Sequence, residues 1–165
     1  MPDHMAAANG YSIVELLATL ALVGILALAA VPTFAGWLLD LRRDAAVSTA
    51  LHAAQVARQI AAVRGEDVRL CGSHDERRCS GLGNWTGNLL VASEVAPVRR
   101  SLPIGANTQL RSNRSAIQFE AGTGHATPAT LVICDRRGAG AARTVVVSRS
   151  GRPRATGPGE AVVAC

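Results

Sequence analysis

The stretch GYSIVELLATLALVGILALAAVP, residues 10–32, decides the fold, because it opens an apolar segment that continues to residue 39. Residues 16–39 carry no charged side chain over 24 positions. As a helix this length spans a bilayer core of ~30 Å. The alternatives fit less well: a signal-peptide core is shorter, and a buried core helix would need a larger surrounding domain. The sequence predicts a transmembrane helix over residues 11–39.

Two residues in this segment point to self-association and to a bend. An ionised carboxylate at Glu15 costs several kcal/mol in an apolar environment unless it has a partner, which a bundle of such helices would supply. Pro32 lacks an N–H group and is expected to kink the helix. Trp37 occupies the place of an interfacial anchor, and Arg42 and Arg43 follow at the expected membrane boundary.

The helix is expected to continue as a stem over residues 40–65. This segment is rich in alanine and free of proline, and Gly65 is a suitable C-terminal stop. Apolar residues recur at helical spacing at Val47, Leu51, Ala54 and Ala57. The stem therefore has an apolar face that can pack against a sheet.

Residues 66–165 have the texture of a β-rich head. Short alternating apolar runs are separated by Gly, Asn, Ser and Pro. The candidate strands are residues 68–70, 89–92, 109–111, 116–120, 129–134, 143–148 and 161–164. With no helical pattern between them, they favour an α+β fold in which a small antiparallel sheet packs on the long helix.

The charge of the chain is unevenly distributed. The net charge is +5, and all 17 basic residues are arginine. Residues 1–97 hold seven arginines against nine acidic residues, a net charge of −2, whereas residues 98–165 hold ten against three, a net charge of +7. The second part is predicted to carry a basic face, either a footprint for nucleic acid or another acidic surface, or a solvated face without a partner.

The four cysteines all follow the apolar segment. An even number in an exported head predicts disulfides, with three possible pairings. We favour Cys71–Cys79, which would close a polar hairpin loop, and Cys134–Cys165, which would fix the C-terminus. The alternative is a metal site with Cys71, His74 and Cys79 as ligands, although a fourth ligand is missing.

The sequence offers no catalytic constellation. No nucleophile–base pair, phosphate-binding loop or pair of carboxylates stands out, so neither an enzyme nor a cofactor is predicted. The glycine-rich stretches EAGTGH and RRGAGAAR are interpreted as hairpin turns. The other histidines, His4, His52 and His125, are interpreted as surface residues.

The N-terminal stretch resembles the start of type IV prepilins and of type II secretion pseudopilins, in which glycine, an aromatic residue, an acid and an apolar run occur together. The resemblance implies peptidase cleavage between Gly10 and Tyr11, with methylation of the new terminus. It also implies that Glu15 neutralises the N-terminal ammonium of an adjacent subunit in a filament. The segments are then a leader (1–10), a membrane and filament-core helix (11–39), a stem (40–65) and a head (66–165).

The head is similar to the FimT/GspH family of minor pilins and pseudopilins. Three stretches carry the resemblance: VRLCGSHDERRCSGLGNWTGNLLV, AIQFEAGTG and LVICDRRGAGAARTVVVSRSGRPR. It implies a type IV pilin-like fold, partnership with other pilins, and residence in the inner membrane with the head in the periplasm before assembly into a surface pilus.

Residues 148–154 are here called the arginine loop. Within it, Gly151–Arg152–Pro153–Arg154 resembles the G-R-x-R motif that is associated with DNA binding in FimT-like pilins. The resemblance implies non-specific binding of double-stranded DNA through Arg152 and Arg154 beside Gly151, in support of DNA uptake during natural transformation. Arg149 and the pair Arg136 and Arg137 are expected to widen the positive field.

The chemistry of the motif suits a polyanion. DNA of arbitrary sequence must be held by its phosphates, and the planar guanidinium matches phosphate oxygens. Gly151 permits a tight turn and Pro153 stiffens the loop, while Arg152 and Arg154 would point the same way in an extended conformation. The alternative is a GspH-like secretion pseudopilin or structural minor pilin that binds no DNA and whose arginines contact sister subunits.

Overall fold

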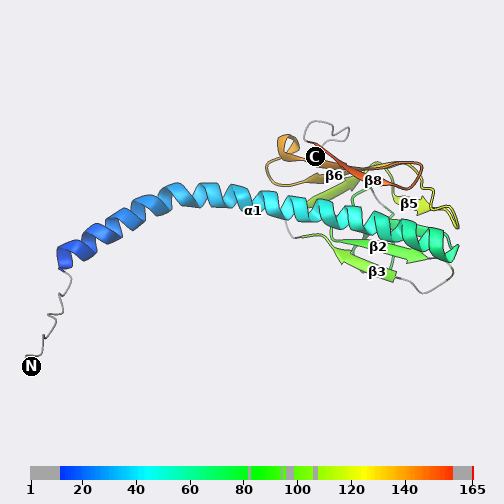
Figure 1. The fold of residues 1–165 in the computed structure, drawn as a ribbon, viewed down its shortest axis with the longest axis horizontal. Helices are drawn as coiled ribbons and strands as arrows, with labels where there is room; N and C mark the ends of the chain where they lie inside the picture. The colour runs from blue at the N-terminus through cyan, green and yellow to red at the C-terminus, as the bar shows by residue number, and fades with distance from the viewer. Residues whose placement is uncertain (1–11, 82, 94, 96–98, 106–107, 158–164) are drawn as a thin grey trace, which may run out of the picture. The chain divides into compact units, whose positions relative to one another are not determined.

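The computed structural model describes residues 12–81, 83–93, 95, 99–105, 108–157 and 165 (Figure 1). They fall into two compact units, Met1–Leu38 and Leu39–Cys165. Helix α1 (Ile13–Arg64) begins in the first unit and ends in the second. Each unit is described by itself.

The helical residues of the first unit expose apolar side chains. Glu15 lies in the first turn of α1, and four residues later the Thr19 hydroxyl donates to the carbonyl oxygen of Leu16 at 2.8 Å. The rings of Phe34 and Trp37 lie 5.6 Å apart between centroids. The large exposed apolar side chains include Leu16, Leu17, Leu20, Leu22, Val23, Ile25, Leu26 and Leu28.

No single helix among the described residues is long and apolar enough to qualify as a membrane span. Two helical segments joined at a bend, Ile13–Leu28 and Thr33–Arg64, qualify together by length and composition. The break between them contains Pro32, where the sequence predicts a kink. The transmembrane helix over residues 11–39 stays a prediction.

In the second unit, the end of α1 presents a buried face made almost wholly of alanine. Val47 and Leu51 pack at the start of this face, the first buried and the second partly so. The fully buried alanines are Ala50, Ala53, Ala54, Ala57 and Ala61. Because alanine side chains are small and favour helix, the face lets the sheets approach the helix backbone closely. The helical spacing predicted from the sequence is confirmed.

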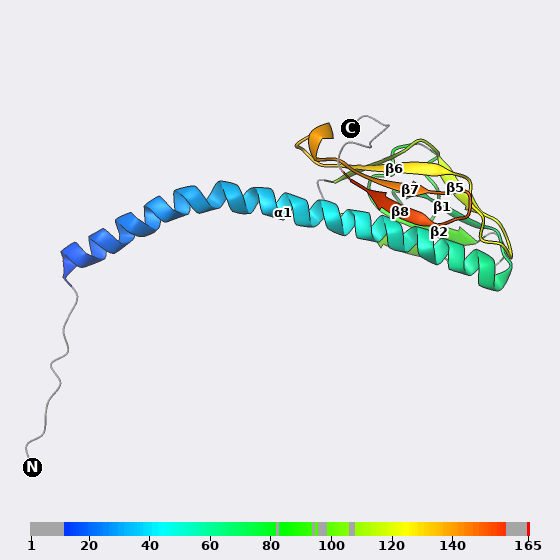
Figure 2. The same ribbon diagram turned by 45° about the horizontal axis from the view of Figure 1, so that its top comes forward.

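Among the described residues, eight strands form two antiparallel four-stranded sheets. The first sheet has the order β3 (Arg99–Pro103), β2 (Asn88–Ser93), β1 (Val68–Ser73) and β5 (Ala116–Phe119). The second has the order β4 (Gln109–Ser112), β6 (Ala129–Cys134), β7 (Arg143–Val147) and β8 (Pro153–Thr156). Figure 1 shows β2 and β3 beside the green end of α1, and Figure 2 shows β7 and β8 on its other side.

The α+β fold predicted from the sequence is therefore correct, with two sheets in place of one. Six of the candidate strands are present, whereas β3 and β8 were not predicted and the candidate at residues 161–164 lies outside the described residues. Both missed strands contain proline and arginine, because edge strands need only one apolar face and tolerate a missing N–H group. β3 and β8 each form one edge of their sheet, and β5 and β4 form the opposite edges.

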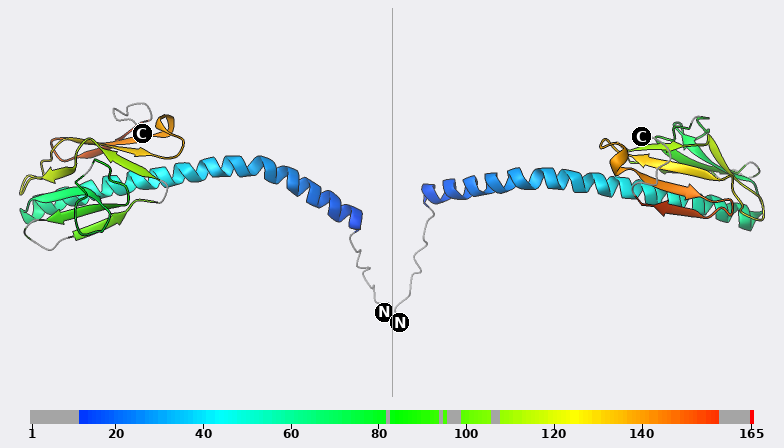
Figure 3. Two further views of the ribbon diagram at one scale, coloured as in Figure 1. Left: turned by 180° about the vertical axis from the view of Figure 1, so that it is seen from behind. Right: turned by 90° about the horizontal axis from the view of Figure 1, so that it is seen from above.

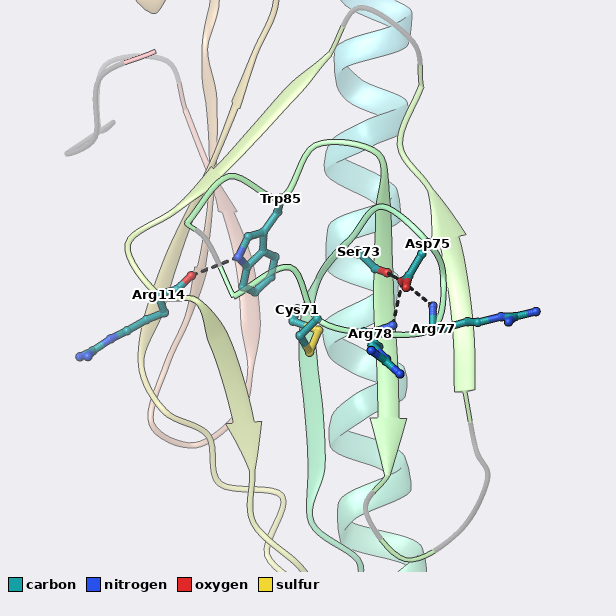
Figure 4. Close-up of a disulfide and its surroundings, with 8 residues drawn as sticks. Cys71, Ser73, Asp75, Arg77, Arg78, Trp85 and Arg114 are labelled. Atoms are coloured by element: carbon teal, nitrogen blue, oxygen red, sulfur yellow. Dashed lines mark hydrogen bonds between the residues drawn. A yellow bond between two sulfur atoms is a disulfide. The ribbon is translucent and has the colours of Figure 1, made fainter.

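The core lies between the alanine face and both sheets, with Trp85 at one end. Its side chain is fully buried, and its indole Nε1 donates to the carbonyl oxygen of Arg114 at 3.1 Å (Figure 4). Gly72 of β1 lies directly beneath it, since a Cβ atom there would come within 2.5 Å of the Trp85 Cα. This close approach explains why a glycine stands inside a buried strand.

Both disulfides favoured from the sequence are formed. Cys71 bonds to Cys79 across eight residues, and Cys134 bonds to Cys165 across 31. The metal-site alternative is wrong, because both of its thiols are consumed in the first disulfide, and the described residues hold no cluster of three or more His, Cys, Asp or Glu side chains that could bind a metal.

The loop closed by the first disulfide is organised by Asp75 (Figure 4). Its carboxylate accepts hydrogen bonds from the backbone N–H groups of Arg77 and Arg78, both at 2.9 Å, and from the Ser73 hydroxyl at 3.1 Å. These bonds, that of Arg77 first, hold the pKa of Asp75 below its usual value. The loop is thus a rigid turn whose two arginine side chains extend outward in Figure 4.

Candidate nucleic-acid interface

The arginine loop is the turn that joins β7 to β8. Two backbone hydrogen bonds of Ser148 close the loop. Its carbonyl oxygen accepts from the N–H group of Gly151 at 2.9 Å, and its N–H group donates to the carbonyl oxygen of Arg152 at 3.2 Å. The Ser148 hydroxyl also lies 2.9 Å from that of Ser150. The backbone of the loop is therefore held by its own hydrogen bonds.

Neighbouring segments fix the loop from outside. Gly151 is buried with φ at 72°, and a Cβ atom there would lie 2.0 Å from the carbonyl oxygen of Gly124. The N–H group of Ala126 donates to the carbonyl oxygen of Arg149 at 2.8 Å, and Arg58 Nε of α1 donates to that of Ser150 at 3.2 Å. The glycine of the motif is thus required by both its backbone conformation and the close packing.

The arginine side chains of the loop remain exposed. Arg149, Arg152 and Arg154 all face solvent. Among the described residues, none of the three forms an ion pair with a carboxylate. Arg154 lies opposite Val146, whereas its neighbours in β8 lie opposite the fully buried Val145 and Val147. By strand alternation Arg154 therefore projects from the face of the sheet that turns away from the core.

The predicted pair Arg136 and Arg137 lies at the other end of β7. It belongs to the β6–β7 connection, which contains the short 3-10 helix at Ala139–Ala141 and confirms the hairpin predicted for RRGAGAAR. The five residues of β7 put roughly 17 Å between that connection and the arginine loop. Figure 2 shows the two at opposite ends of the sheet.

The other glycine-rich stretch, EAGTGH, forms the hairpin turn predicted from the sequence, because an antiparallel bridge between Phe119 and Ala126 closes it. The turn also leads from β5 of the first sheet to β6 of the second. Its Gly122 N–H group donates to the carbonyl oxygen of Ala61, and its Gly124 packs on Arg58. The arginine loop packs against this turn, because Gly151 lies against the carbonyl oxygen of Gly124.

Arg137 is committed to an ion-pair network at the start of the stem. Its guanidinium bonds Asp135 at 2.6 Å and Asp40 at 2.9 Å. Asp40 also pairs with the buried Arg43, which in turn pairs with Asp44 and donates to the carbonyl oxygen of Ala141 at 3.0 Å. Three carboxylates surround two guanidinium groups, so this cluster adds no positive charge to the surface.

The network shifts the titration of its members. The hydrogen bonds and charge of Arg137 lower the pKa of Asp135 against the opposing effect of burial, and they lower that of Asp40 in the same way. The two carboxylates raise the pKa of Arg137 above its usual value. The structure thus assigns Arg137 to holding the β6–β7 connection on the stem, while Arg136 beside it is exposed.

The remaining predicted site residues lie outside this region. Gly10 and Tyr11 fall outside the described residues, and Glu15 belongs to the first unit. Sequence reasoning missed Arg58, which contacts the arginine loop from α1. Its only sequence signal is its place one residue after the buried Ala57, which puts it at the edge of the apolar helix face.

Residues 46–151 match the model of the protein family described as type II transport protein GspH. The match covers most of the stem and every strand except β8 and ends at Gly151, so Arg152 and Arg154 lie just beyond it. No curated protein matches the chain in sequence.

Two solved structures of the type IV minor pilin FimU from Pseudomonas aeruginosa PAO1 share the fold. One has a TM-score of 0.57 at 19% identity and covers 74% of this chain and 98% of the FimU chain; the other has a TM-score of 0.54 at 20% identity and covers 74% and 96%. The minor pseudopilin EpsH of the Vibrio cholerae type 2 secretion system has a TM-score of 0.46 at 16% identity and covers 69% and 97%. The likeness to FimU shows a type IV pilin-like fold.

Proposed function

Because the chain belongs to the GspH family, we propose that it is a minor pilin of a type IV pilus that binds double-stranded DNA through its arginine loop. The binding is independent of base sequence and serves DNA uptake in natural transformation. The observation that carries the proposal is the combination of a fixed backbone with three exposed arginines that have no carboxylate partner among the described residues.

The arginine loop offers its positive charge without having to rearrange. A loop already ordered loses little conformational entropy when it binds. Arg149, Arg152 and Arg154 can each donate to phosphate oxygens, which carry no sequence information. Arg136, at the far end of β7, would extend the footprint, whereas Arg137 has its charge balanced by Asp135 and Asp40.

In the proposed function, the N-terminal part of the chain directs assembly into the pilus. Prepilin peptidase cleaves between Gly10 and Tyr11, the new terminus is methylated, and the chain waits in the inner membrane with its head in the periplasm. On assembly, the exposed apolar side chains of the first unit are covered by the helices of other pilins. Glu15 then meets the terminal ammonium of a neighbouring subunit.

A mobility-shift experiment tests the proposal. The full chain in a nonionic detergent is titrated into a labelled duplex of about 30 base pairs at low salt, alongside the double variant Arg152→Ala/Arg154→Ala. We expect the wild type to shift the duplex and the variant to need at least about tenfold more protein, because two phosphate contacts are lost. Equal shifts, or none, would refute the DNA site.

The second candidate function is a structural pseudopilin of a type II secretion system, and the description of the matched family favours it. In that case the arginines contact sister subunits. Deletion of the gene would then abolish secretion of exported enzymes and leave transformation unchanged, whereas the first proposal requires the reverse.

A further inference from the structure

A hollow of about 360 Å³ lies where α1 passes β8 in the second unit. It is lined by Gln55, Arg58 and Gln59 of the helix and by Arg152 and Pro153 of the arginine loop. Figures 2 and 3 show the red strand β8 running beside this green part of α1. The lining therefore joins the helix to the loop, although the two are about 90 residues apart in the sequence.

Arg58 is built into this hollow. Its Cγ and Cδ atoms lie 3.0 and 3.1 Å from where Cβ atoms would stand on Gly124 and Gly151, so the side chain crosses both glycines. Its Nε–H group donates to the carbonyl oxygen of Ser150. Because that contact fixes the plane of the guanidinium, the position of its two terminal NH₂ groups is fixed as well.

Those NH₂ groups have no partner among the described residues. Arginine has five N–H donors, and Arg58 uses one of them for Ser150. The lining includes a second arginine, Arg152, and two glutamines, but no acidic residue. Two cations that line one hollow without a counter-ion favour an anion with several acceptor oxygens.

We infer that Arg58 and Arg152 together hold one backbone phosphate of bound DNA in this hollow, with Gln55 and Gln59 as further donors. The inference rests on the proposed DNA binding and adds helix α1 to the interface. A duplex would then lie along the line between α1 and β8, and Arg58 would act both as a phosphate contact and as the anchor of the loop.

The test measures binding of the full chain in nonionic detergent to a labelled duplex by fluorescence anisotropy, over a range of salt concentrations. Arg58→Ala is compared with Arg77→Ala, which removes an equal charge from the exposed Cys71–Cys79 loop. We expect Arg58→Ala to weaken binding about three- to tenfold and to reduce the salt slope by about 0.9, the share of one phosphate. Arg77→Ala should leave the slope unchanged.

A second variant keeps the result clear if Arg58→Ala loosens the loop. Gln59→Glu places a carboxylate in the hollow and leaves the Arg58–Ser150 hydrogen bond in place. Ser48→Glu adds the same charge at an exposed position of α1 about three turns earlier, outside the hollow. We expect Gln59→Glu to weaken binding several-fold more than Ser48→Glu does.

The outcomes separate the inference from the proposed function. In one outcome, the wild type binds DNA and Arg152→Ala/Arg154→Ala weakens binding, but Arg58→Ala and Gln59→Glu behave like their controls. The hollow then holds no phosphate, while the arginine loop still binds DNA. If the wild type fails to bind DNA at low salt, the proposed function and the inference fall together. Loss of binding in both hollow variants but in neither control supports the inference.

Discussion

The backbone of Gly151 has φ at 72° and lies against the carbonyl oxygen of Gly124. Both features exclude a side chain, because a Cβ atom would be strained by the conformation and would overlap that oxygen. The residue therefore fixes the position from which Arg149 and Arg152 project.

Gly151→Ala tests this role. We expect it to lower the free energy of unfolding by about 1–3 kcal/mol and to weaken DNA binding, because the loop must leave Gly124. Urea unfolding of the unit Leu39–Cys165, which contains the whole core, measures the first effect. Gly157→Ala is the matched control, since a Cβ atom there meets no atom within 4 Å. Equal stability of the two variants would contradict the assigned role.

Glu15→Ala tests the proposed assembly contact. The substitution removes a charge from the first turn of α1 and leaves the apolar run intact. We expect the protein to remain in the membrane fraction but to be depleted from sheared pili, because the ammonium of the neighbouring subunit loses its partner. Serine at position 12 offers a control, as Ser12→Ala removes only a hydroxyl. Normal incorporation of Glu15→Ala would argue against the pairing.

The elements of the second unit are tied by two disulfides that close loops of different length. Loop-closure entropy in the unfolded chain gives about 2–3 kcal/mol for the eight-residue separation of Cys71 and Cys79, and about 3–4 kcal/mol for the 31-residue separation of Cys134 and Cys165. Urea unfolding of the two double alanine variants should therefore show the larger loss for Cys134→Ala/Cys165→Ala. The reverse order would show that strain or residual structure outweighs loop length.

The β6–β7 connection is held on the stem by ion pairs that depend on pH. Arg137 lowers the pKa of Asp135 in the folded protein. The ion pair between them therefore stabilises the fold fully at pH values above 3.8, the ordinary pKa of aspartate, and this stabilisation is lost as the pH falls through the lowered pKa of Asp135. Arg137→Ala should thus be less stable than wild type at pH 6, and the difference should shrink toward pH 2. Arg136→Ala, which removes an exposed neighbouring charge, should show no such trend. The measurement is the urea midpoint of unfolding of each variant and of the wild type between pH 6 and pH 2.

Elements with strong local patterns could be predicted from the sequence. The alanine-rich stem has helical spacing, and the central strands β6 and β7 are continuous apolar runs. Strands β3 and β8 contain no such run, so their place in the sheets depends on pairing with a neighbour that only the fold supplies. The candidate site was likewise only partly predictable. The local motif identifies Arg152 and Arg154, but the pairing of Arg137 with Asp40 joins residues 97 positions apart, and no local pattern reveals it.

In the proposed function, the whole molecule combines a membrane-inserted, filament-forming helix with a head that carries a basic loop. Net charge is uneven along the chain, with −2 over residues 1–97 and +7 over residues 98–165, so the positive excess lies in the later part of the head. A long-range attraction of this kind speeds the encounter with a polyanion and is screened by salt. The DNA-binding claim therefore predicts a dependence on ionic strength as well as on particular side chains.

The most direct test is the salt dependence of duplex binding by the full chain and by Arg152→Ala/Arg154→Ala. The logarithm of the binding constant should fall linearly with the logarithm of salt concentration, and the slope of the variant should be smaller by about 1.8, the share of two phosphates. Equal slopes for the two proteins, or no binding by the wild type at low salt, would contradict the claim that these two arginines hold DNA.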